Sequence, residues 1–165
     1  MQIRKILIAE DNANDAELML MALQKHRLSN ELIFVRDGAQ ALDYLYCRGE
    51  YAGRHDGHPA LVLLDLKMPK VDGIEVLRQV KSDPALKHIP VVVLTSSREE
   101  QDLVRTYSLG VNAYVVKPMK FQDFVQAVKQ VGIFWAVVNE IPPASRHYSE
   151  QAAVAAIPAK YERQT

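Results

Sequence analysis

Five short apolar segments, rich in valine, isoleucine and leucine, recur along the chain and are separated by amphipathic segments. Two of them are unbroken apolar runs, LVLL at 61–64 and VVVL at 91–94. Such runs are typical of central strands that are covered on both faces. Segments 3–9, 32–35 and 113–116 complete the set. Strands that alternate with helices predict an α/β fold with a doubly wound parallel sheet.

The segments between the strands have the period of an amphipathic helix. Met19, Leu20 and Leu23 share one face of the first of these segments, and Asn14 with Glu17 predicts where that helix begins. The remaining helices are expected over 38–46, from 73 onward, over 99–108 and from 121 onward. The prediction is therefore five strands and five helices.

Composition limits the classes of protein to which the chain can belong. The chain has 165 residues with 20 basic and 20 acidic side chains, and it lacks the Lys/Arg-rich run of a typical nucleic-acid-binding protein. The single cysteine, Cys47, excludes a disulfide framework. Apolar segments stay far below the ~20 residues that cross a bilayer, and the N-terminus lacks the apolar core of a signal peptide. We therefore expect a cytoplasmic protein, with one domain over 1–134 and a C-terminal extension over 135–165.

Polar side chains follow the central strands at the point where each strand ends. They are Glu10 and Asp11 after the first apolar segment, Asp65 after the third, Thr95 at the end of the fourth and Lys117 after the fifth. In a doubly wound sheet the carboxyl ends of parallel strands lie along one edge, where ligands bind. A turn or a helix cap explains any one of these residues. It does not explain three carboxylates, a hydroxyl and an ammonium at corresponding positions.

The chemistry of these five side chains indicates a phosphoryl pocket. Three carboxylates in one place repel one another unless a cation lies between them. Oxygen ligands at an open edge favour Mg²⁺, which commonly binds a few carboxylates together with phosphate oxygens. Lys117 adds a fixed positive charge. We therefore expect a site for a phosphoryl group in which one carboxylate is the nucleophile.

Four segments then resemble the motif set of response-regulator receiver domains: IAED at 8–11, LLDLKMPKVDG at 63–73, VLTSS at 93–97 and YVVKP at 114–118. The resemblance implies a flavodoxin-like sheet with strand order 2-1-3-4-5. It also implies a single-domain regulator of a two-component phosphorelay, which accepts a phosphoryl group from a sensor histidine kinase and signals by protein contacts. Such a protein is not an enzyme in its own right, although it assists its own phosphotransfer and dephosphorylation.

The same resemblance implies a role for each site residue. Asp65 is expected to be the phosphoacceptor and to act with Thr95 and Lys117 as the catalytic residues, with Lys117 binding the phosphate. Thr95 and Tyr114 are expected to form the conformational switch. The implied ligands of Mg²⁺ are Glu10, Asp11, Asp65 and the main-chain carbonyl of Lys67. Glutamate at position 10 replaces the commonest residue, aspartate, which lengthens the side chain but keeps its charge.

Three further features are similar to the small single-domain regulators that partner bacterial and cyanobacterial phytochrome histidine kinases. They are the glycine-rich loop 48–59, KHIPVVVLTS at 87–96, and FW at 134–135 followed by IP at 141–142. This similarity implies a phytochrome kinase as the partner. The loop is longer than an average connection, so we expect it to project from the surface.

Apolar residues continue past the length that the receiver itself requires, at Trp135, Val137, Val138 and Ile141. A short alanine-rich helix is expected over 149–157, and a helix of that length is unstable in water unless it docks. We therefore expect a homodimer in which this C-terminal arm and the fourth and fifth helices pack on the partner protomer.

Three other interpretations of the same residues stay open. A Mg²⁺-dependent phosphatase of the haloacid-dehalogenase type also uses an aspartate nucleophile, but it needs Asp-x-Asp after the first strand, where this chain has Glu10 and Asp11. A nucleotide- or flavin-binding module needs a Gly- or Ser/Thr-rich phosphate loop at that place. A degenerate receiver that serves only as an interaction scaffold does not need the full set of polar side chains.

Overall fold

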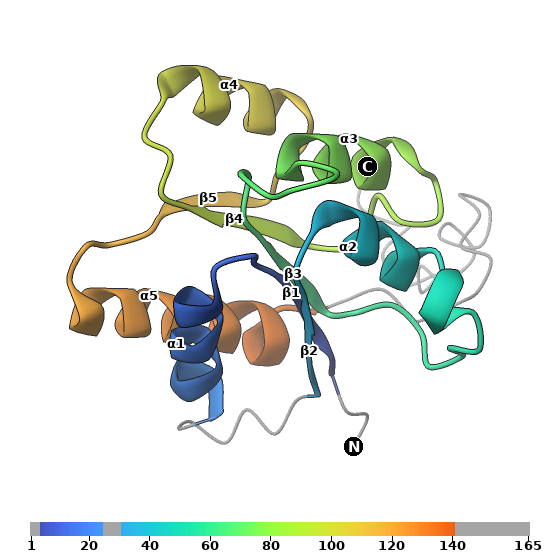
Figure 1. Ribbon diagram of the computed structural model, residues 1–165, viewed down its shortest axis with the longest axis horizontal. Helices are drawn as coiled ribbons and strands as arrows, with labels where there is room; N and C mark the ends of the chain where they lie inside the picture. Colours follow the sequence, from blue (N-terminus) through green and yellow to red (C-terminus); the bar gives the residue numbers. More distant parts are fainter. Residues whose placement is uncertain (1–3, 25–30, 141–165) are drawn as a thin grey trace, which may run out of the picture.

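A central sheet of five parallel strands, in the order β2-β1-β3-β4-β5, organises the computed structural model, which describes residues 4–24 and 31–140 (Figure 1). The strands are β1 Ile6–Ala9, β2 Leu32–Val35, β3 Leu61–Leu64, β4 Val91–Thr95 and β5 Ala113–Val116. The predicted strand order is confirmed. The first predicted strand is shorter than expected, because pairing of β1 begins only at Ile6.

Five α-helices cover the sheet, with α1 and α5 on one face and α2, α3 and α4 on the other (Figure 1). They are α1 Ala13–Gln24, α2 Gly38–Leu45, α3 Gly73–Ser82, α4 Glu100–Ser108 and α5 Phe121–Ile133. A single 3₁₀ turn spans Gly49–Tyr51. None of the helices in the described part of the chain is long and apolar enough to span a bilayer.

The core has two layers because the strands bury side chains on both faces. Leu7 and Ala9 of β1 belong to the layer under α2 and α3, whereas Ile6 and Ile8 belong to the layer under α1 and α5. The central strands β1, β3 and β4 are buried at every position, as the unbroken apolar runs predict. Burial of this kind is the main favourable contribution to folding.

Helix α4 contributes much less to the core than the other helices. Only Thr106 of this helix is buried, whereas Leu103, Val104 and Tyr107 are 39%, 59% and 54% exposed. The sequence of α4 offers only Leu103, Val104 and Tyr107 as large apolar side chains, which is consistent with this placement. Because little apolar area holds it, α4 costs less to displace than its neighbours.

The start of α1 differs from the sequence prediction, which placed it at Asn14. The helix begins at Ala13, and the Asn12 side chain accepts a hydrogen bond from the Asp15 N–H at 3.1 Å. In both pairs, Asn12 with Asp15 and Asn14 with Glu17, an asparagine is followed three residues later by an acidic residue. The sequence therefore offers two similar candidates for the N-cap of this helix.

The loop 48–59 is anchored to the domain, although it was predicted to project. The Arg54 guanidinium lies 4.0 Å from the ring centroid of Tyr44 and donates to the Tyr44 carbonyl at 2.9 Å. Arg54 also pairs with Asp56 at 2.7 Å, and Asp56 forms an ion pair with Lys5. We predicted a projecting loop from its length and composition, and neither shows which partners the cationic side chain of Arg54 will find.

The C-terminal end of α5 is tied to the N-terminal segment. A π-helix over Phe134–Val138 continues α5, and the Arg4 guanidinium donates to the carbonyls of Ala136 and Asn139, each at 3.0 Å. These carbonyls lack a partner within the helix, so a cation satisfies them well. The predicted helix over 149–157 lies outside the described residues.

Gly73 fixes the close approach of α3 to the end of β3. A Cβ atom at this position would lie 2.2 Å from the Asp65 carbonyl oxygen and 2.7 Å from the Leu66 Cα. The Gly73 N–H donates to the Leu66 carbonyl at 2.8 Å. Only glycine therefore lets the chain turn back so tightly behind Asp65.

We expect Gly73→Ala to lower the free energy of unfolding by about 1–3 kcal/mol, because the added methyl group overlaps backbone atoms. Urea denaturation measures this change. Gly53→Ala is the matched control, since a Cβ atom at Gly53 meets nothing within 4 Å. Equal losses in the two variants would contradict the steric explanation.

Candidate functional site

The strand register brings the predicted site residues to one edge of the sheet. Ala9 of β1 pairs with Leu64 of β3, so Glu10 and Asp65 leave the sheet at matching positions. Thr95 of β4 pairs with Val116 of β5, which places Lys117 immediately beyond that pair. The Lys117 N–H donates to the Thr95 carbonyl at 2.7 Å and fixes this position.

The Lys117 ammonium is the centre of the site. Its Nζ atom lies 2.6 Å from Glu10 Oε2 and 3.2 Å from Asp65 Oδ2. The third partner is Asp15 of α1, whose Oδ2 atom lies 2.8 Å away. The Lys117 side chain is 8% exposed, and each of its three ammonium hydrogens has a carboxylate to meet.

Asp15 was missed in the sequence analysis, which considered only residues at strand ends. Asp15 is the third residue of α1 and reaches the site because helical side chains tilt toward the helix N-terminus. An acidic residue in the first turn of the helix that follows the acidic pair is the signal that could have found it. An acidic residue at this position is usually explained by its favourable interaction with the helix dipole, and that explanation does not indicate a role in the site.

Burial and the neighbouring charges shift the pKa values of Glu10 and Lys117. Burial raises the pKa of Glu10 to about 7, even though Lys117 acts in the opposite direction, and the Asp65 charge adds to the rise. Burial alone would lower the pKa of Lys117, but hydrogen bonds to Asp15 and Glu10 outweigh it and raise the pKa above its usual value. The site thus holds a permanent cation and more carboxylates than that cation can neutralise.

Glu10, Asp11 and Asp65 are placed to hold a metal ion. Each offers one carboxylate oxygen, and these three oxygens lie within 4.8 Å of one another. The Asp65 Oδ1 atom is buried and has no hydrogen-bond partner, whereas Asp11 is exposed to solvent. Donors that are all oxygen suit a hard divalent cation. The predicted donor set therefore fits such an ion, while the ligand role of the Lys67 carbonyl stays a prediction.

The residues of the predicted switch are connected through Ser97. Thr95 is fully buried, and its hydroxyl accepts a hydrogen bond from the Ser97 N–H at 3.3 Å. The Tyr114 hydroxyl donates to the Ser97 carbonyl at 3.1 Å. Ser97 also donates through its hydroxyl to Asp102 of α4 at 2.6 Å, a contact that the sequence did not indicate. Tyr114 and α4 are thus joined to the segment that follows Thr95.

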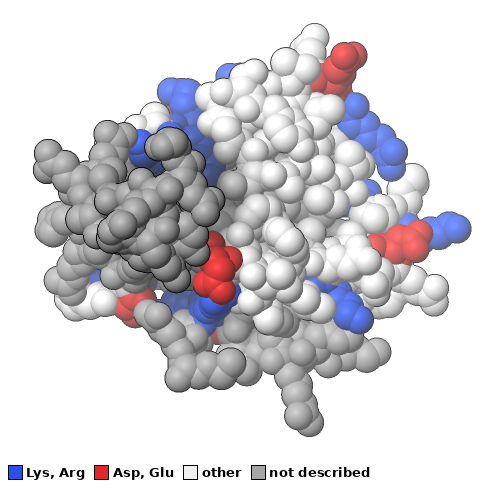
Figure 2. All heavy atoms as spheres, turned by 180° about the vertical axis from the view of Figure 1, so that it is seen from behind, with Lys and Arg blue, Asp and Glu red and all other residues white. Residues whose placement is uncertain are grey.

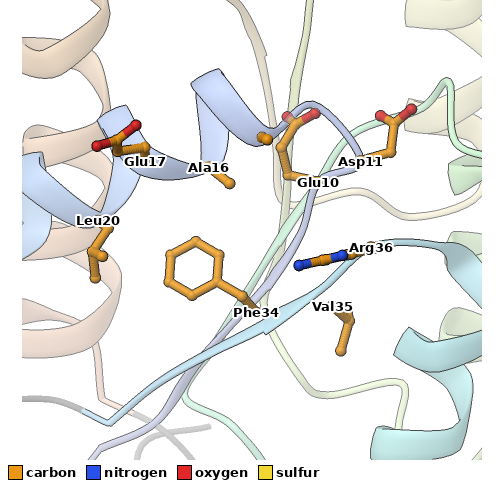
Figure 3. A pocket seen from close by; sticks show the side chains of 9 residues that line it. Glu10, Asp11, Ala16, Glu17, Leu20, Phe34, Val35 and Arg36 are labelled. Carbon is orange, nitrogen blue, oxygen red and sulfur yellow. The ribbon is translucent and has the colours of Figure 1, made fainter.

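A cavity of about 440 Å³ opens beside the acidic cluster, between α1 and β2 (Figure 3). Glu10 and Asp11 lie at one end of this cavity, and Leu20 and Phe34 line its apolar part. Asp11, the exposed member of the acidic cluster, faces solvent beside this cavity, whereas Glu10 is buried.

Comparison with known proteins is consistent with this arrangement. The family model described as the response regulator receiver domain matches residues 6–129. The curated response regulator Rcp1 of Synechocystis sp. is 41% identical over 139 residues, which are 84% of this chain and 93% of that protein.

Solved structures give the same result. The phosphorylated cyanobacterial phytochrome response regulator RcpA is 44% identical with a TM-score of 0.80, over 84% of this chain and 98% of that one. The bacteriophytochrome response regulator AtBRR is 59% identical with a TM-score of 0.69, over 85% of this chain and all of its own (100%). A structure of Rcp1 in its Mn²⁺-bound form has a TM-score of 0.79 at 40% identity and covers 84% of this chain and 99% of that one.

The raised pKa of Glu10 makes a prediction for the metal-free protein. Between the usual value of 4.5 and the folded value of about 7, the folded chain binds more protons than the unfolded chain. The stabilising contribution of Glu10 is therefore complete below the usual value and is lost as the pH rises through about 7.

Urea denaturation in EDTA across this pH range, for the wild type and Glu10→Gln, measures the effect. We expect the stability of the wild type relative to the variant to fall as the pH rises. A difference that stays constant with pH would show that the Glu10 carboxyl is not perturbed.

Proposed function

The chain belongs to the response-regulator receiver family, and from that membership we propose that it is a single-domain regulator whose Asp65 accepts a phosphoryl group from a sensor histidine kinase in a Mg²⁺-dependent reaction. One observation carries the assignment to Asp65. Its Oδ2 atom is held by Lys117, and its Oδ1 atom is buried without a partner at the carboxyl end of the central strand β3. A carboxylate with one oxygen held and the other unpaired is suited to act as a nucleophile.

In the proposed reaction, an oxygen of Asp65 attacks the phosphorus of a phosphohistidine. A P–O bond forms as the P–N bond breaks, and the imidazole leaves with the bonding electron pair. Lys117, whose ammonium is 3.2 Å from Asp65 Oδ2, offers its positive charge to the transferred oxygens. A divalent cation held by Glu10, Asp11 and Asp65, with the Lys67 carbonyl as a further ligand, supplies neutralising charge.

The proposed output is a change in the surface around α4. The acyl phosphate adds about −1.5 to −2 charge and new acceptor oxygens beside Thr95. A Thr95 hydroxyl that turns toward the phosphate gives up its contact with the Ser97 N–H. Tyr114 and Asp102 are bonded to Ser97, so the change reaches α4, which little core area holds in place. Thr95 and Tyr114 thus act as the switch.

The proposed partner is a phytochrome histidine kinase, since RcpA and AtBRR are described as regulators of phytochrome and bacteriophytochrome. We place the protein in the cytoplasm, where such kinases present their phosphohistidine. Signalling through contacts with other proteins, without DNA binding, agrees with the equal numbers of basic and acidic residues, 20 of each. The chain assists its own phosphotransfer and dephosphorylation and turns over no separate substrate.

Two alternatives are less well supported. A phosphatase of the haloacid-dehalogenase type needs its nucleophile after the first strand, whereas here Asp65 follows β3 and carries the buried oxygen that has no hydrogen-bond partner. A scaffold without phosphotransfer has no use for a lysine that is bonded to three carboxylates in a nearly buried site.

We also propose a homodimer, with a receiver over 1–134 and an arm over 135–165 that packs on the partner. The described part of the arm exposes apolar side chains, since Val137 and Val138 are 56% and 60% exposed. Met119, which lies just before α5, is 94% exposed, and Phe121, the first residue of α5, is 55% exposed. Seen from behind, the domain presents a broad surface with few charged side chains (Figure 2). Residues 141–165 of the arm lie outside the described residues.

Phosphorylation is expected to fail in Asp65→Asn, because the amide is not a nucleophile. Incubation with labelled acetyl phosphate and Mg²⁺, followed by mass spectrometry, measures acceptor occupancy. Asp123→Asn, an exposed aspartate in the first turn of α5, is the control and keeps wild-type labelling. EDTA is expected to stop labelling of the wild type, and labelling of Asp65→Asn would assign the acceptor elsewhere.

Removal of residues 141–165 of the arm is expected to shift the protein toward monomer. Sedimentation equilibrium compares the full chain with a chain that ends at Glu140, which keeps the π-helix and its contacts to Arg4. An unchanged association constant would exclude residues 141–165 from the dimer interface.

A further inference from the structure

We propose that Asp15 is a positioning residue that anchors the Lys117 ammonium in the site, an inference that rests on the phosphoacceptor function proposed for Asp65. Asp15 Oδ2 lies 2.8 Å from Lys117 Nζ, closer than the 3.2 Å that separates Nζ from Asp65 Oδ2. The contact joins the first turn of α1 to the residue after β5. It is therefore a long-range contact made by the tertiary fold.

Asp15 differs from Glu10 and Asp65, the other two partners of Lys117, because those two are also candidate metal ligands. Glu10 and Asp65 both belong to the group of carboxylates whose oxygens are close enough to share one metal ion. Asp15 is not a member of that group. When a divalent cation binds, Glu10 and Asp65 interact with that cation as well as with the Lys117 ammonium, so their attraction for the ammonium weakens. Asp15 is the one partner that keeps its full attraction for Lys117.

The surroundings of Asp15 suit a permanent anchor. Its side chain is 29% exposed, against 0% for Glu10, so water shares the cost of keeping its charge in the site. The Asp15 backbone is fixed by the hydrogen bond from its N–H to the Asn12 side chain at 3.1 Å. The side chain thus starts from a rigid helical turn, which limits where the ammonium can move.

The anchor has a direct consequence for phosphoryl transfer. A lysine on a flexible four-carbon stem loses entropy when it meets a new anion. An ammonium already held within 3.2 Å of Asp65 Oδ2 has lost most of that freedom before the phosphoryl group arrives. Asp15 touches no reacting atom in this scheme. It acts through Lys117.

The test compares Asp15→Asn, which removes the charge and keeps the shape, with Asp123→Asn, the same chemical change in the first turn of the neighbouring helix α5. With acetyl phosphate and Mg²⁺ as probes, we expect the rate of Asp65 phosphorylation to fall about tenfold to a hundredfold in Asp15→Asn, the range typical of residues that orient a ligand or catalytic group. Asp123→Asn is expected to match the wild type. Asp15→Glu, which keeps the carboxylate, is expected to lie closer to the wild type than Asp15→Asn does.

A second readout does not depend on phosphorylation. An ammonium held by three carboxylates exchanges its protons slowly, so ¹⁵N NMR of the metal-free protein should show a Lys117 Nζ signal, assigned by its loss in Lys117→Met. We expect Asp15→Asn to shift or broaden this signal and Asp123→Asn to leave it in place. Equal phosphorylation rates in the two variants, or an unchanged Nζ signal in Asp15→Asn, would overturn the anchor. A wild type that takes no label, with the Nζ signal still dependent on Asp15, would instead reject the proposed function.

Discussion

The attraction between one buried ammonium and the carboxylates around it is the interaction on which this site depends. Lys117 joins β5 to β1 through Glu10, to β3 through Asp65 and to α1 through Asp15, so the ends of three strands and the start of a helix converge on one atom. Removing the ammonium from this nearly buried group would leave its carboxylates uncompensated, which is far more costly than losing an exposed ion pair. The carboxylates still outnumber the ammonium, and this excess is what creates the demand for a second cation.

The same charge balance explains how a small chemical event can change a distant surface. The sheet and the helices α1, α3 and α5 are held by extensive apolar burial and do not respond to a local change of charge. Helix α4 is the exception, because it buries only Thr106 and is bonded to the reactive edge through Asp102 and Ser97. The fold thus combines a rigid platform with one weakly held element that is bonded to the reactive edge.

The sheet could be predicted from sequence because its signals are local. Unbroken apolar runs define the central strands, and the residue after each run falls at the same edge once the strands are parallel. Asp15, Asn12 and Arg54 were missed or misjudged for a common reason. Each matters through a partner far away in the chain or through a choice between two similar local patterns, and neither is visible in a single segment. The Asp15–Lys117 pair exists only after the sheet has formed, and the Arg54–Tyr44 pair requires the loop to fold back on α2.

The bonds from Arg4 to the carbonyls of Ala136 and Asn139 also constrain the order in which the protein is made. A ribosome releases Arg4 and the adjoining strand β1 first, yet the groups that complete this corner emerge only after the whole sheet has left the exit tunnel. The corner that these bonds close therefore stays incomplete during synthesis until residues 136–139 have emerged.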